Sequence, residues 1–264
     1  MKRVLTIAGS DSSGGAGLQA DLKTFAAYGL YGMSVITALT AQNTTGVQDV
    51  LDTPPDFVAA QMASVFEDIR PDAVKIGMLS SPVIVEVIAE NLKKYGAENI
   101  VLDPVMGATS GSSLIKSEAV EAMEEALFPL ATVITPNLKE AEVLAKRPLP
   151  DKDAMVEAAR EIGQAFPCAV LIKRAEGAAD ADDYLFHDGQ GQWICGDRIP
   201  NPNTHGTGCT LSSAIAAGLA LGYDLDKAVH EAKAYIDGAI RAGLDLGQGR
   251  GPLHHGYRQF PLNQ

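Results

Sequence analysis

The chain has 264 residues, 46% of them hydrophobic, and this length and apolar content predict one large α/β domain spanning residues 1–264. Its formal net charge is −12 with no basic cluster to offset it, which argues against nucleic acid as a partner, and its three widely spaced cysteines give neither a disulfide framework nor a zinc site. No apolar run reaches the roughly 18 residues of a membrane span, and the N-terminal apolar run is too short for a signal peptide, so we expect a cytoplasmic protein with no membrane partner.

Short β-branched runs alternate with longer amphipathic runs along the chain. The predicted strands are residues 4–8, 34–40, 73–76, 100–102, 132–134 and 169–172. The helical patterns between them cover residues 17–28, 56–69, 82–95, 117–128 and 154–165. This alternation predicts a mainly parallel sheet with helices on both faces.

Two segments, residues 184–195 and 107–113, depart from this alternation, and a further helical run lies at residues 211–221. Residues 184–195 form two β-prone runs around a glycine-containing turn, which predicts a hairpin on the sheet edge. The small-residue run 211–221 is too long for an ordinary strand and predicts a buried helix, closed by Gly222. Residues 107–113 are small and polar, which suits either a solvated connection or a mobile flap over a site.

A glycine-rich segment, residues 9–17, follows the first predicted strand, at the edge where open α/β sheets bind ligands. Its glycines fit a relaxed dinucleotide-binding pattern, but the acidic residue that would bind a ribose and the Lys-Ser/Thr pair of a Walker A loop are both missing. A close backbone approach to another small ligand remains, with Asp11 or Asp21 accepting hydrogen bonds. The alternative is a tight turn with Asp21 on a solvated helix face.

Gln42 and Asn43 follow the second predicted strand. Each amide both donates and accepts hydrogen bonds, as recognition of a heteroaromatic ring edge requires. The alternative is a pair of amides that cap a turn.

Oxygen-bearing side chains follow two neighbouring strands, with Asp103 after one and Asn137 and Glu140 after the other. Carboxylate oxygens near a phosphate suit Mg²⁺, which keeps several waters and takes one or two carboxylates from protein. Asn137 and Glu140 also have the spacing of a helix capping box, and the two interpretations are compatible. Lys173, after the last predicted parallel strand, either neutralises a phosphate or is simply solvated.

The segment 203–210 places two glycines and Cys209 where a buried helix begins. Backbone amides at a helix N-terminus stabilise an anion, so a phosphate or a phosphoryl group in transfer fits here. In the same field the Cys209 thiol is expected to lose its proton more easily than an ordinary cysteine. The alternative is a glycine-rich turn in which Cys209 is a small buried apolar residue.

Taken together, these motifs resemble the ribokinase-like superfamily and, within it, the hydroxymethylpyrimidine/phosphomethylpyrimidine kinases of thiamine synthesis. The resemblance covers almost the whole chain, in the segments 8–21, 37–43, 75–79, 103–106, 134–142 and 203–210. Each segment alone is weak, whereas the series in this order is highly specific. It implies a three-layer fold with a mainly parallel central sheet, helices on both faces and a small edge hairpin.

The resemblance also implies an activity: ATP phosphorylates 4-amino-5-hydroxymethyl-2-methylpyrimidine to the monophosphate and then to the diphosphate. It implies that Gln42 pairs with the pyrimidine edge, in a pocket lined by Gly9, Asp21 and Met78. The ATP end would hold Asp103, Asn137, Glu140 and Lys173, with Mg²⁺ bound by Asp103 and Glu140, in part through water. Gly206, Thr207 and Gly208 match the anion hole, and Cys209 stands where most of the superfamily has a basic aspartate. A homodimer is also implied.

Two other functions compete with this one. Pyridoxal kinases of the thiamine-kinase-like branch are similar but add a second cysteine in the flap, and residues 103–113 contain none. A non-catalytic pyrimidine-binding protein could keep the fold, but the intact glycines and Cys209 argue against it. The chain departs from its relatives at residues 174–176, where they commonly have Gly-Gly-His, and in the flap. A cysteine hydrolase is disfavoured, because adjacent His205 is not expected to reach the thiol in the required geometry.

Overall fold

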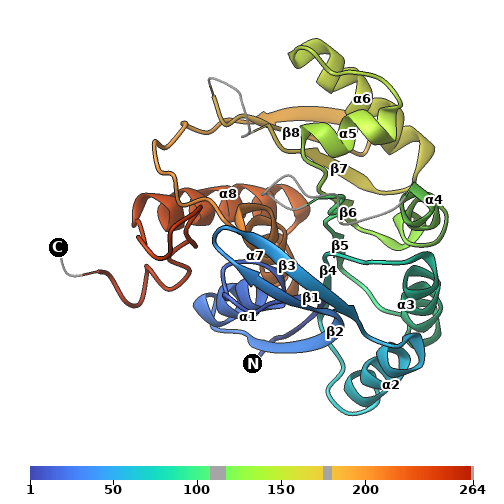
Figure 1. Cartoon of the computed structure of the whole chain (residues 1–264). Helices are drawn as coiled ribbons and strands as arrows, with labels where there is room; N and C mark the ends of the chain where they lie inside the picture. The colour runs from blue at the N-terminus through green and yellow to red at the C-terminus, as the bar shows by residue number, and fades with distance from the viewer. Residues whose placement is uncertain (108–116, 175–179, 263–264) are drawn as a thin grey trace.

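The computed structural model describes residues 1–107, 117–174 and 180–262, and the predicted flap falls outside this part except for Gly107. One nine-stranded sheet with the order β3-β2-β1-β4-β5-β6-β7-β8-β9 runs through the described residues (Figure 1). The strands are β1 (Arg3–Asp11), β2 (Tyr31–Asn43), β3 (Gly46–Asp52), β4 (Ala73–Ile76), β5 (Ile100–Leu102), β6 (Val133–Ile134), β7 (Ala169–Ile172), β8 (Asp183–His187) and β9 (Gln190–Ile194). Six neighbouring strands are parallel to one another, in the order β2, β1, β4, β5, β6 and β7, so the predicted parallel sheet is confirmed.

The sheet ends in antiparallel strands at both edges. β8 pairs with β7 and β9 pairs with β8, which confirms the predicted edge hairpin. At the other edge β3 turns back along β2, a strand that we did not predict. The side chains of β3 are mostly exposed, so the apolar pattern that reveals buried strands is weak in this segment.

Helices cover both faces of the sheet, which completes the predicted three layers (Figure 1). One face carries α1 (Gly17–Ala27), α7 (Thr207–Ala220) and α8 (Leu225–Arg241), and the other carries α2 (Pro55–Phe66), α3 (Pro82–Tyr95), α4 (Ser117–Ala126), α5 (Leu138–Ala145) and α6 (Lys152–Ala165). A separate apolar core lies under each set. The alternation along β1 shows why: Val4 packs into the core under α7, whereas Leu5 and Ile7 pack into the other one.

Several strands and helices have bounds that differ from the predicted ones. β1 and β2 extend to Asp11 and Asn43, so Gly9 and Gln42 belong to strands rather than to the loops after them. The buried helix α7 begins at Thr207 instead of residue 211 and places the glycine pair at its start. Helix α8 was not predicted, although its alternation of apolar and charged residues has the helical period. In the part of the chain that the structure describes, no helix combines the length and apolarity of a membrane span.

Candidate active site

The N-terminus of α7 meets the glycine-rich segment that closes β1. Gly206 has a φ of +82°, and a Cβ there would collide with the carbonyl of Gly15, so only glycine fits. No side-chain hydrogen bond caps this helix. Amide groups in the first turn of an uncapped helix attract anions. The position and geometry thus match the anion-binding interpretation of residues 206–208.

An ion pair stands beside the same helix turn. Lys173 donates to Asp103 Oδ1 at 2.7 Å, and the Thr135 hydroxyl donates to the same oxygen at 3.0 Å. A Cβ on Gly208 would lie 3.3 Å from Lys173 Nζ and 3.4 Å from Asp103 Oδ2. The alternative of a solvated Lys173 is therefore wrong, because its side chain is only 12% exposed and is paired. A cation, a carboxylate and the helix N-terminus converge on one place.

Glu140 completes this group from the start of α5. Asn137 and Glu140 form the predicted capping box: Asn137 Oδ1 accepts from the Glu140 amide at 3.0 Å, and Glu140 Oε2 accepts from the Asn137 amide at 2.7 Å. Burial raises the pKa of Glu140 to about 7, even though Lys173 and the amides of Asn137 and Met106 favour its charged form. Glu140 is thus a carboxyl group that titrates near neutral pH.

Asp21, expected either in the pyrimidine pocket or on a solvated helix face, lies completely buried. Its carboxylate is 2.9 Å from Lys75 Nζ, and it accepts from the hydroxyls of Thr6 and Ser213 at 2.6 Å each. The solvated alternative is wrong. Both carboxylate oxygens already have protein partners, so Asp21 stabilises the residues beneath the site.

The pKa of the Cys209 thiol differs from the expected one. Burial raises this pKa to about 11, although the nearby Lys75 ammonium and the Gly17 amide favour the thiolate. Desolvation outweighs the effects of Lys75 and of the Gly17 amide, and the carboxylates of Asp21 and Asp103 add to the rise. The prediction of an easily deprotonated thiol is therefore wrong for this structure, in which Cys209 is a thiol at neutral pH.

The residues expected around the pyrimidine lie near the ends of β1 and β2 and after β4. A Cβ on Gly9 would lie 2.8 Å from Met78 Cε, so these two residues are in contact. Gln42 lies beside the α7 side of the site, with its amide 3.4 Å from His205 Nε2. Gly9, Met78 and Gln42 thus belong to the same edge of the sheet as the N-terminus of α7.

Two partnerships in the site were missed from the sequence. Asp11 Oδ2 lies 2.8 Å from His205 Nε2 and also accepts from the amides of Gly15 and Ala16, which ties the glycine-rich segment to the segment before α7. Lys75 is a fully buried cation below the site. A lysine inside the apolar strand 73–76 was the one available signal, because a buried lysine needs a partner.

The described residues contain no cluster of three or more His, Cys, Asp or Glu side chains arranged around a metal ion. Asp103 and Glu140 are nevertheless buried carboxyl groups close enough to influence each other's charge. Mg²⁺ is usually bound by one or two carboxylates together with substrate phosphates and water, rather than by protein ligands alone. Two neighbouring carboxyl groups therefore suffice for a magnesium site.

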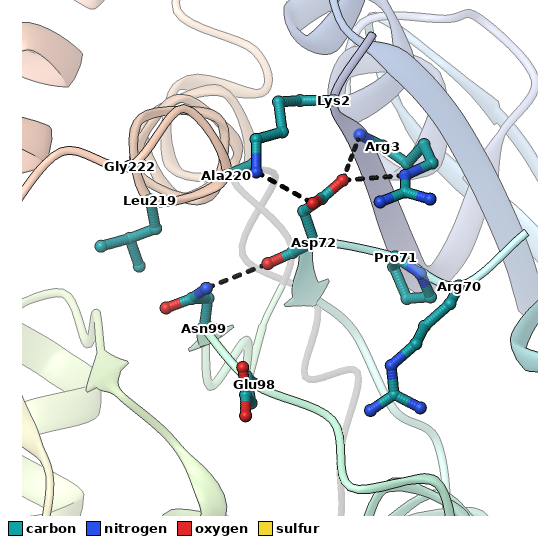
Figure 2. A pocket seen from close by; sticks show the side chains of 10 residues that line it. All are labelled: Lys2, Arg3, Arg70, Pro71, Asp72, Glu98, Asn99, Leu219, Ala220 and Gly222. Carbon is teal, nitrogen blue, oxygen red and sulfur yellow. Dashed lines mark hydrogen bonds and ion pairs between the residues drawn. The ribbon is translucent and has the colours of Figure 1, made fainter.

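A hollow of about 390 Å³ lies at the opposite end of the strands. Figure 2 shows that its walls are lined by Lys2, Arg3, Arg70, Pro71, Asp72, Glu98, Asn99, Leu219, Ala220 and Gly222. Asp72 at its centre accepts hydrogen bonds from Lys2 at 3.0 Å and from the backbone and guanidinium of Arg3 at 2.9 Å each. Lys2 and Arg3 pair with Asp72, and the hollow lies at the amino ends of β1 and β4, away from the edge at which such sheets bind ligands.

Comparisons with known proteins agree with one another. The family model described as phosphomethylpyrimidine kinase matches residues 11–254. A Rhizobium meliloti protein named hydroxymethylpyrimidine/phosphomethylpyrimidine kinase is 51% identical over 258 residues, which are 96% of this chain and 97% of that protein.

Solved structures also resemble the chain. A phosphomethylpyrimidine kinase from Clostridium difficile has a TM-score of 0.81 and 49% identity, over 91% of this chain and 100% of that one. The ADP complex of Bacillus subtilis pyridoxal kinase has a TM-score of 0.89 and 39% identity, over 97% of both chains.

Proposed function

The chain belongs to the phosphomethylpyrimidine kinase family, and from this premise we propose that it phosphorylates 4-amino-5-hydroxymethyl-2-methylpyrimidine and then the resulting monophosphate, in thiamine synthesis. The chain is an ATP-dependent kinase. The observation that carries the proposal is the position of Gly208, which brings an uncapped helix N-terminus against the Lys173–Asp103 pair.

Residues 206–208 hold the phosphoryl group during transfer, because their amides supply fixed positive charge without reorganisation. Phosphoryl transfer passes through a loose transition state and depends on positioning and charge, so a weak base suffices. Cys209 would act as the base only as its thiolate, because a neutral thiol has no site for another proton. Burial raises its pKa to about 11, so the thiol proton must first leave to solvent, after which the thiolate accepts the proton of the acceptor alcohol as the phosphorus–oxygen bond forms.

The nucleotide lies on the side of Lys173, Asp103, Asn137 and Glu140. Lys173 would interact with a phosphate of ATP from its position beside the first turn of α7. Asp103 and Glu140 would hold Mg²⁺, in part through water, and the ion would supply positive charge to the phosphates of ATP. Asn137 positions Glu140 through the capping box.

The pyrimidine lies on the side of Gln42, Gly9 and Met78, above the buried Asp21 carboxylate. Gln42 can pair with both a donor and an acceptor on the ring edge. The absence of a side chain at Gly9 leaves room for Met78 at the wall of this pocket.

We expect one domain, cytoplasmic location and a homodimer. An exposed apolar group at the β2–β3 edge, made of Leu39, Val50 and Leu51, supports the dimer, because unpaired strand edges with apolar side chains favour association. Light scattering on the purified chain and on the Leu51→Asp variant tests it, and a monomeric parent protein would contradict it.

The proposed function is tested by turnover of Mg-ATP with three acceptors: the hydroxymethylpyrimidine, its monophosphate and pyridoxal. We expect both pyrimidines to be phosphorylated in preference to pyridoxal. A clear preference for pyridoxal would instead assign the chain the activity of its Bacillus subtilis structural neighbour. If no acceptor is phosphorylated, the chain is a binding protein.

A further inference from the structure

Ser12, the first residue after β1, is bonded to the backbone of Gln42 near the end of β2. Its hydroxyl donates to the Gln42 carbonyl at 2.8 Å and accepts from the Gln42 amide at 2.9 Å. A serine hydroxyl carries one proton and two acceptor lone pairs, so it makes both bonds at once. The two bonds hold the main chain of Gln42 against the glycine-rich segment, residues 9–17.

The strand pairing at Gln42 is irregular. The register of the β2–β3 ladder shifts between Ala41 and Gln42. A shift of this kind bends the strand and changes the direction of the neighbouring side chain. The ladder alone therefore does not determine where Gln42 points, and Ser12 supplies a further constraint at this residue.

The glycine-rich segment reaches the proposed anion hole only three residues after Ser12. Gly15 lies so close to Gly206, at the start of α7, that a Cβ on Gly206 would collide with the Gly15 carbonyl. Three steps of backbone span at most about 10 Å. Residues 12–15 thus join the residue proposed to bind the ring to the turn proposed to bind the phosphoryl group.

The buried side chain of Asp11 gives this connection a fixed shape. Its Oδ1 accepts from the amide and the hydroxyl of Ser13 at 2.8 Å and 2.7 Å. Its Oδ2 accepts from the amides of Gly15 and Ala16 at 3.1 Å and 2.8 Å. The Gly14 amide donates to the Asp11 carbonyl at 2.9 Å. Stretching the segment would break several of these hydrogen bonds, so its length is constant.

We propose that Ser12 is a specificity-determining positioning residue, which fixes the distance between Gln42 and the N-terminus of α7 and thereby favours the pyrimidine alcohol over its monophosphate as the acceptor. This inference rests on the proposed function, in which Gln42 contacts the ring and residues 206–208 bind the phosphoryl group. In the alcohol the attacking oxygen is bonded to the methylene carbon on the ring. In the monophosphate the attacking oxygen lies two bonds farther out, beyond the phosphorus. One fixed distance does not suit both oxygens equally well.

The two acceptors also differ in what holds them in the site. The alcohol is neutral, so its position depends on the contact between Gln42 and the ring edge. The monophosphate carries an anionic group as well, which the backbone amides and the lysine side chain of the site attract. Loosening the bond between Ser12 and Gln42 should therefore slow the reaction of the alcohol more than that of the monophosphate.

The kinetic test compares the two acceptors by kcat/KM at saturating Mg-ATP. Ser12→Ala removes both bonds to the Gln42 backbone. Because Ser12 is exposed, this variant should fold as the parent protein does. We expect kcat/KM for the alcohol to fall about tenfold more than kcat/KM for the monophosphate, the size of one lost hydrogen bond.

Two further variants separate positioning from a general loss of activity. Ser12→Thr keeps a hydroxyl and should keep the acceptor ratio of the parent protein. Ser64→Ala removes an exposed hydroxyl that is bonded to a backbone carbonyl within α2, and it is the matched control. Equal losses for the two acceptors in Ser12→Ala would overturn the proposal.

A second measurement does not depend on turnover. Hydrogen exchange followed by NMR of the full chain should show the Gln42 backbone amide exchanging faster in Ser12→Ala, because it loses its acceptor, and at the parent rate in Ser64→Ala. An unchanged rate in Ser12→Ala would contradict the inference. If the parent protein phosphorylates neither pyrimidine, the proposed function fails and the acceptor preference fails with it, whereas the exchange rate still decides whether Ser12 holds Gln42.

Discussion

Lys173 donates a hydrogen bond to Asp103 at 2.7 Å, and this contact joins the carboxyl ends of β7 and β5 across the end of β6. Asp103 is 2% exposed, and a carboxylate buried to this degree requires a partner of this kind. The pair stabilises the fold and supplies charge to the proposed nucleotide site.

Removing the cation should therefore destabilise the protein. In Lys173→Met the Asp103 carboxylate stays buried without its ion partner, and we expect a loss of about 3 kcal/mol in the free energy of unfolding. Urea denaturation measures this loss. The matched control is Arg147→Met, which breaks an exposed pair with Glu161 and should cost less than about 1 kcal/mol. Equal losses in the two variants would show that Lys173 is not a buried partner.

Cys209→Ala should lower turnover while the affinity for the pyrimidine stays nearly unchanged, because a base acts on the chemical step rather than on substrate binding. Steady-state kinetics and a binding titration measure the two quantities separately. Cys195→Ala, at an exposed position, is the control. Parallel losses of turnover and affinity would remove the assignment of Cys209 as the base.

The Cys209 thiol should react slowly with iodoacetamide at neutral pH. Burial raises its pKa to about 11, so the reactive thiolate is scarce at pH 7. While the pH stays below that pKa, each increase of one pH unit raises the thiolate population about tenfold. Site-resolved mass spectrometry should find exposed Cys195 modified first at pH 7.5. Rapid labelling of Cys209 at that pH would mean that the helix field outweighs desolvation.

Gln42→Ala should weaken pyrimidine binding by about 1 to 3 kcal/mol, the cost of leaving ring polar groups unpaired. Isothermal titration calorimetry measures the change. Gln48→Ala, on the exposed strand β3, should bind the pyrimidine as the parent protein does. If both variants bind equally well, Gln42 does not contact the ring.

Glu140 should make the stability fall as the pH rises. Its folded pKa of about 7 lies above its ordinary value of 4.5, so between these values the folded protein holds a proton that the unfolded chain releases. The stabilisation is complete below pH 4.5 and is lost through pH 7. Glu140→Gln should lose less stability than the parent between pH 5 and pH 8 in urea denaturation.

Glu157→Gln, at an exposed carboxylate, is the control for this experiment and should follow the parent protein. A Glu140→Gln variant with the pH dependence of the parent would mean that Glu140 is ionised throughout this range.

The sequence predicted the layers of the fold because buried parallel strands are short apolar runs between helices of clear period. The strands 73–76, 100–102 and 169–172 and the helix 82–95 have the predicted bounds. The exposed edge strand β3 lacked this signal. The capping box of Asn137 and Glu140 is local in sequence and could be read directly.

The contacts that assemble the site are not local. Asp11 and His205 are 194 residues apart, and no sequence spacing relates them. The pKa of Cys209 depends on the balance between unfavourable burial and the favourable Lys75 ammonium, and only the three-dimensional structure places both beside the thiol. Pattern reasoning identified the helix N-terminus but not the depth at which the thiol lies.

The contact between Gly206 and the Gly15 carbonyl has a consequence for biosynthesis. When the ribosome has made the first strand and its glycine-rich segment, the opposing wall of the proposed anion hole is still untranslated. Asp21 likewise lacks one of its hydrogen-bond donors until Ser213 in α7 has been translated. A stalled nascent chain that ends before residue 203 can therefore build most of the sheet and still have no activity.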